Sequence, residues 1–97
     1  MKEKKLMKKI SKKNEFLKEI KLFLEQNCGL DKNINPKDLI FSTNKIDSLN
    51  ILKLVEFLEN FFNITISPLD VGFKNFDSFN KIINFLETRH KISFNNY

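Results

Sequence analysis

Only two glycines and two prolines interrupt the 97 residues of this chain. A sheet built from tight hairpins needs glycine at many of its turns, and the common phosphate-binding loops are rich in glycine, so both are excluded. The length supports one small domain, and 41% hydrophobic residues are enough to give that domain a core. We therefore expect a single all-α domain.

The sequence also lacks the side chains that form a disulfide or zinc framework. It has one cysteine, Cys28, and one histidine, His90, so neither an internal disulfide nor a Cys/His zinc site can form. No segment approaches the roughly 20 apolar residues that cross a bilayer, and no apolar stretch of a secretory signal follows the first lysines. We expect a cytoplasmic protein that does not bind membranes.

The positive charge is concentrated at the N-terminus. The formal net charge is +5, but residues 1–13 hold seven lysines against one glutamate. Residues 14–97 carry ten positive and eleven negative groups, which is a net charge of −1. We expect residues 1–13 to be a basic leader that is either disordered or extends the first helix, and we do not expect a nucleic-acid partner.

Apolar spacing predicts two helices joined by a long connection. The first helix covers about residues 14–28, and Gly29 ends it. The connection over residues 29–47 is longer than most loops of compact domains, which is typical of functional loops. The second helix covers about residues 48–62, with an apolar stripe formed by Ile51, Val55, Leu58 and Phe62 and flanked by Leu54 and Phe61.

Two further helices are predicted after the second. Ser67 and Pro68 match the cap and first position of a short third helix, which Gly72 limits. Asp77 is predicted to cap a fourth helix that extends to about residue 89. We expect the tail, residues 91–97, to be frayed.

The second helix opens with Asp47, Ser48 and Leu49. Alone, such a triplet is explained by helix capping. Here it follows a helix and a long loop, opens an amphipathic helix, and precedes a short helix begun by proline and then a last helix. In this order and in its Asp-Ser-Leu triplet, the chain resembles the acyl carrier proteins over about residues 14–90. The resemblance implies an all-α four-helix bundle with three longer helices, a short third helix and a long loop between the first and second.

The resemblance also implies a function for the triplet. In acyl carrier proteins the matching serine carries a covalent 4′-phosphopantetheine arm, here expected on Ser48, which holds an acyl group as a thioester in fatty-acid or polyketide biosynthesis. Asp47 and Leu49 are then the residues expected to engage the phosphopantetheinyl transferase. Further implied partners are an acyl- or aminoacyl-loading ligase and a downstream transferase or synthase, and the carrier is expected to be a monomer. Near Ser48 the sequence offers no histidine or lysine placed to activate its hydroxyl, so we do not expect an enzyme.

The chain departs from the family pattern at two places. A glycine usually precedes the motif, whereas here Asn44 or Lys45 must form the turn. The second helix of the family is usually acidic, but residues 48–63 hold only two glutamates against one lysine. Because surface charge sets association rate and partner choice, we expect a dedicated pathway with its own loading enzyme. The residues expected to face that partner, besides Leu49, are Leu52, Lys53 and Glu56.

Three alternatives remain open. An aminoacyl or peptidyl carrier protein shares the fold and the motif. A small basic helical protein could bind nucleic acid through its lysine leader by counterion release. An adaptor could have the carrier fold without the arm, because fold does not determine function.

Overall fold

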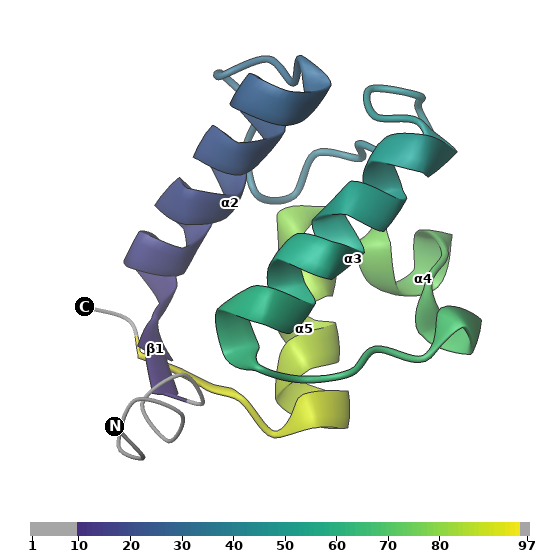
Figure 1. Ribbon diagram of the computed structural model, residues 1–97. Coiled ribbons are helices and arrows are strands. Elements are labelled where there is room, and N and C mark those ends of the chain that lie inside the picture. The colour runs from purple at the N-terminus through teal and green to yellow at the C-terminus, as the bar shows by residue number, and fades with distance from the viewer. Residues whose placement is uncertain (1–9, 96–97) are drawn as a thin grey trace.

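Three longer helices dominate the computed structural model, which describes residues 10–95 (Figure 1). They are α2 (Lys13–Cys28), α3 (Ser48–Phe62) and α5 (Phe79–His90). The shorter elements are β1 (Ile10–Lys12), the 3-10 turn η1 (Pro68–Asp70), the one-turn helix α4 (Phe73–Phe76) and β2 (Ser93–Asn95). The predicted all-α class is therefore confirmed for the body of the domain, and the two short strands are an unpredicted addition.

The helices bury their apolar stripes in one core. In α3, Leu54 and Leu58 are fully buried while Val55 is half-buried, so the core side of this helix is turned slightly from the predicted stripe. Phe16 of α2 meets Phe62 of α3 with ring centroids 5.3 Å apart, in a tilted arrangement favourable for aromatic pairs. The many phenylalanines of the sequence therefore serve mainly to fill the space between the helices.

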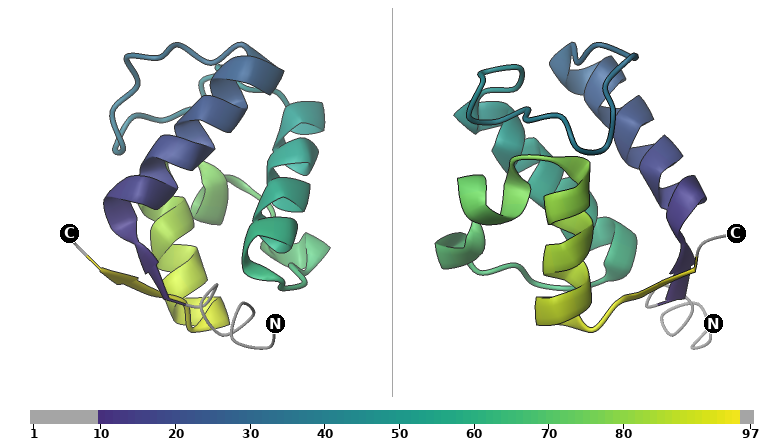
Figure 2. Two further views of the ribbon diagram at one scale, coloured as in Figure 1. Left: turned by 60° about the vertical axis from the view of Figure 1, so that its left-hand side comes forward. Right: turned by 180° about the vertical axis from the view of Figure 1, so that it is seen from behind.

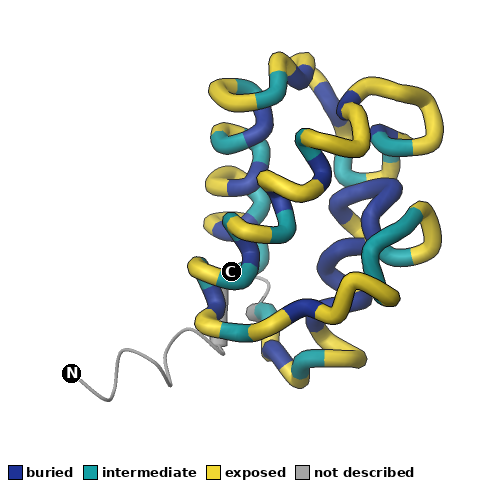
Figure 3. Tube along the Cα trace, turned by 45° about the vertical axis from the view of Figure 1, so that its right-hand side comes forward, coloured by how far each residue is buried: buried dark blue, intermediate teal, exposed yellow. Residues whose placement is uncertain are grey.

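The long connection between α2 and α3 belongs to the core as well. Buried positions alternate with exposed ones along it, as Figure 3 shows. The buried side chains are apolar and spread over the whole connection: Leu30, Ile34, Ile40 and Ile46. This segment is therefore an ordered part of the domain although it has no regular secondary structure.

The helix ends test four sequence predictions. Gly29 ends α2 in the left-handed conformation, with φ 70°, as predicted. The predicted bounds of the second helix are confirmed by α3. The expectation that Asp77 caps the last helix is wrong, because the Ser78 side chain accepts the Lys81 N–H and Asp77 is used elsewhere. The predicted third helix is divided, since η1 ends at Asp70 and α4 begins only after the extended Gly72.

The two ends of the described chain pair with each other, which corrects two expectations. Of the predicted leader, Lys13 extends the first helix by one residue, since α2 begins there. Ile10–Lys12 neither extends this helix nor is disordered, because it pairs in parallel with Ser93–Asn95 (Figure 2). The tail is not frayed over these residues: Ile92 is buried, and the Phe94 ring lies 5.2 Å from that of Phe16. Residues 1–9 and 96–97, the rest of the predicted leader and tail, lie outside the described residues.

Candidate functional site

Ser48 is the first residue of α3 and is exposed. The preceding residue, Asp47, has extended backbone angles and caps the helix, since its carboxylate accepts the Asn50 N–H at 2.9 Å. The Asp47 carbonyl also accepts the Ile51 N–H at 2.9 Å. The cap predicted from the triplet is thus confirmed, and it fixes the backbone on either side of the serine.

The turn before the triplet is formed by Asn44, one of the two residues predicted to replace the usual glycine. Asn44 has φ 62°, in the left-handed region that asparagine tolerates better than most residues. Two residues later, Ile46 is buried and its N–H donates to the Ile40 carbonyl at 2.9 Å. The chain is therefore anchored in the core directly before it reaches Asp47 and Ser48.

A second anchor of this connection comes from Asp77, between α4 and α5. Its carboxylate Oδ1 accepts the N–H groups of Phe41 and Ser42, each at 2.8 Å. Its carbonyl accepts the Ile40 N–H at 2.8 Å. Burial acts to raise the pKa of Asp77, but hydrogen bonds from Ser42, Phe41 and Ile40 outweigh it, so the pKa lies below its usual value.

The sequence does not indicate the partners of this anchor. A carboxylate just before a helix is most simply interpreted as a cap, and the partners of Asp77 are 35 and 36 residues away. The adjacent Ser78 was the signal that could have been used, because a second capping residue leaves the first free for another role.

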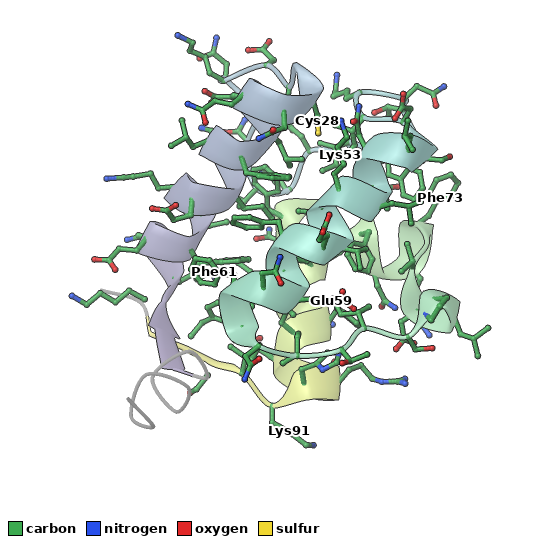
Figure 4. All side chains as sticks on the ribbon, in the orientation of Figure 1. Cys28, Lys53, Glu59, Phe61, Phe73 and Lys91 are labelled. Carbon is green, nitrogen blue, oxygen red and sulfur yellow. The ribbon has the colours of Figure 1, made fainter. Side chains whose placement is uncertain are left out.

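Large apolar side chains lie exposed around the start of α3. Leu49 is 67% exposed and Leu52 is 59% exposed, as their position opposite the core predicts. Phe73 of α4 is also exposed (Figure 4). Its ring packs edge-on against Phe41 of the connection, with centroids 4.8 Å apart. Apolar side chains of α3 and α4 are therefore exposed to solvent, and Phe41 of the connection packs against one of them.

The charges on α3 are sparse. Lys53 and Glu56 are both exposed, as predicted for residues that face a partner. The other acid of the helix, Glu59, is turned back to accept the Ile66 N–H at 2.8 Å. The exposed side of α3 thus offers one free acid and one lysine instead of an acidic stripe.

An open groove of about 570 Å³ runs between α2 and α3. Phe23 and Phe57 stack across it with centroids 4.6 Å apart, and Lys53 and Glu56 stand at its side. Phe57 and Ser48 are nine residues apart, so at 3.6 residues per turn they point to opposite sides of α3. The groove and the serine are therefore separate features of the helix.

Cys28 lies at the end of α2 near Lys53 (Figure 4). Burial raises the pKa of its thiol more than the positive charge of Lys53 lowers it, and Asp47 adds a smaller raising effect. The thiol is thus less reactive at neutral pH than an ordinary cysteine, which agrees with a packing role.

The described part of the chain contains no group of three or more His, Cys, Asp or Glu side chains that could hold a metal ion. Over the same residues, no helix combines the length and the apolar character needed to cross a membrane. Comparisons of the chain with protein-family models, with curated proteins and with solved structures find no match.

Proposed function

We propose that this chain is a carrier protein whose bundle is of the acyl-carrier type and whose Ser48 bears a 4′-phosphopantetheine arm. The observation that supports this best is the placement of Ser48. It is exposed at the first position of a long amphipathic helix, behind a capping aspartate and at the end of a connection held by buried residues. Such a serine is accessible to a modifying enzyme while its backbone is held in one conformation.

The start of α3 also suits the product of the modification. The arm comes from coenzyme A: a bond forms between Ser48 Oγ and phosphorus, the nucleotide part of coenzyme A leaves, and the transferase takes the hydroxyl proton. The phosphodiester is an anion beside backbone N–H groups that have no acceptor within the helix, and the helix dipole favours negative charge there. Asp47 holds this backbone and is the residue proposed to engage the transferase and its magnesium.

The proposed docking surface for partners consists of Leu49, Leu52, Lys53 and Glu56 on α3, together with the exposed Phe73 of α4. Exposed apolar residues supply the contact, and the sparse charges determine which enzymes associate quickly. Because this surface lacks an acidic stripe, we propose a loading ligase and a downstream transferase or synthase of a dedicated pathway. The thioester cargo is an acyl group or the related aminoacyl group, and the carrier acts as a cytoplasmic monomer without enzymatic activity of its own.

Mass spectrometry with several broad-specificity phosphopantetheinyl transferases and coenzyme A tests the proposal. The wild-type chain should gain the mass of one arm, and Ser48→Ala should gain none while keeping its helical circular dichroism. Ser67→Ala is the matched control, since Ser67 is another exposed serine before a helical turn, and it should be modified like the wild type.

Other results would support the alternatives. An unmodified wild-type chain with every transferase would favour the adaptor without an arm. Salt-dependent binding to a DNA duplex that Ser48→Ala retains would favour the nucleic-acid alternative.

A further inference from the structure

We propose that Asp77 is a positioning residue for arm attachment: it holds the connection before α3 in the conformation that presents Ser48 to the transferase. This inference rests on the proposed function. It concerns a carboxylate that lies 29 residues after the serine in the sequence and that the structure places against the loop leading to it.

Several hydrogen bonds link Asp77 to the triplet. The Asp77 carbonyl accepts the Ile40 N–H, and the Ile40 carbonyl in turn accepts the N–H of Ile46, the residue before Asp47. The Asp77 carboxylate holds the next two amides, those of Phe41 and Ser42, at 2.8 Å each. Asp77 therefore holds residues 40–42 directly, and it holds Ile46 indirectly through Ile40.

Asp77 is suited to this role because it is held firmly itself. It is only 5% exposed, and it directly precedes Ser78, the cap of α5. A second bond from the first turn of α5, between the Asn80 N–H and the Pro36 carbonyl at 3.0 Å, ties the connection further upstream. Hydrogen bonds to an ionised carboxylate are stronger than those between neutral groups, and the lowered pKa of Asp77 keeps it ionised at neutral pH.

The same bonds hold the apolar side of the proposed docking surface. Phe41, whose N–H Asp77 accepts, packs its ring edge-on against the exposed Phe73. Loss of the carboxylate therefore releases the amides of Phe41 and Ser42, and with Phe41 its ring contact with Phe73. The backbone bond from Ile40 to the Asp77 carbonyl and the buried faces of α2, α3 and α5 remain.

The experiment measures kcat/KM for arm attachment by one transferase and coenzyme A, with amide hydrogen exchange on the same proteins. Asp77→Ala should lower kcat/KM by about tenfold or more, because small displacements of a reacting group are costly. Exchange should accelerate at Phe41 and Ser42, whose N–H groups lose their acceptor, but not within α2 or α5. Asp77→Asn keeps one acceptor oxygen but loses the charge, so its kcat/KM should lie between those of Asp77→Ala and the wild type. If Asp77→Ala fails to fold, a wild-type kcat/KM in Asp77→Asn together with faster exchange at Phe41 and Ser42 would overturn the positioning role.

Two controls separate positioning from general stability. Asp38→Ala removes a half-buried carboxylate that accepts the Asn35 N–H within the same connection, and it should leave kcat/KM within about twofold. Ile92→Ala destabilises the core after the end of α5 and should also leave kcat/KM nearly unchanged at a temperature where the variant is folded.

The outcomes distinguish the two proposals. Wild-type rates in Asp77→Ala despite faster exchange at Phe41 and Ser42, or an equal loss of rate in Ile92→Ala, would overturn the positioning role while the carrier function stands. A wild-type chain that no transferase modifies would overturn the carrier function and the positioning role together.

Discussion

Helix α3 and the connection that precedes it are both well ordered, but different interactions hold them. The helix is specified locally, by an apolar stripe, a capping aspartate and a left-handed Asn63 at its end. The connection has no such repeat, and it is held by single buried side chains and by Asp77, which lies more than 30 residues away. Ser48 lies at the junction of the two segments, as the first residue of α3.

This difference has a consequence for function. The bounds of α3 follow from residues within the helix and next to it, so we expect substitutions elsewhere to shift its first residue, Ser48, little. The connection depends on the start of α5, so the approach to Ser48 should respond to changes there. Substitutions in the two regions should therefore differ in their effects on stability and on arm attachment.

The largest loss of stability is expected from substitutions in the core, to which both regions contribute. Leu58 of α3 and Ile40 of the connection are each fully buried, so changing either to alanine should lower the free energy of unfolding by about 2 to 5 kcal/mol. Urea denaturation of the two variants measures this. A negligible loss for Ile40→Ala beside a large one for Leu58→Ala would contradict the ordered connection.

The next largest effect is the pH-dependent contribution of Asp77 to stability. Because its pKa in the folded state is lowered, its stabilising contribution is complete above the ordinary value of 3.8 and is lost as the pH falls through the folded pKa. The free energy of unfolding of the wild type should exceed that of Asp77→Asn by about 1 to 2 kcal/mol near neutral pH, because hydrogen bonds to a charged acceptor are stronger. The difference should shrink in acid. Denaturation curves over a pH series measure it, and a difference that persists unchanged in acid would contradict the assignment.

A smaller effect is expected from the paired ends of the chain. Removing residues 1–12 deletes β1 and should lower the free energy of unfolding by about 1 kcal/mol, because the backbone hydrogen bonds to β2 are lost. Removing residues 1–9 leaves β1 in place and serves as the control. Thermal melts of both should show a lower midpoint for the longer deletion only, and arm attachment should continue in both. Equal midpoints would show that the strand pair contributes nothing to stability.

The smallest effect on stability is expected on the docking surface. Lys53→Glu should change the free energy of unfolding by less than about 0.5 kcal/mol, because the side chain is exposed. It should speed loading by a fatty-acid acyltransferase that recognises acidic carriers, more at low salt than at high salt. Lys81→Glu, an exposed lysine on α5, is the control. Identical rates for both variants and wild type would contradict a selective role for this side of α3.

The features that the sequence predicts well are those with local causes. The bounds of α3, the stop at Gly29, the turn at Asn44 and the exposure of Leu49 and Leu52 all follow from patterns within a few residues. Such patterns act through backbone preference and side-chain periodicity, which neighbouring residues determine.

The features that it misses depend on residues far apart in the chain. The pairing of Ile10–Lys12 with Ser93–Asn95 joins opposite ends, and short strands of this kind have no distinctive periodicity. The sequence pattern assigns Asp77 to the nearest helix, because its partners, Phe41 and Ser42, become its neighbours only after folding. Prediction from sequence therefore located the candidate serine but not what holds it in place.

The central claim is that Ser48 carries the arm, and the most direct test is the intact mass of the protein isolated from the cells that make it. The account predicts a fraction whose mass exceeds that of the chain by one 4′-phosphopantetheine group, with the addition on the peptide that contains Ser48. A protein that has only the mass of its unmodified chain under all growth conditions, or an arm on a different residue, would contradict the account.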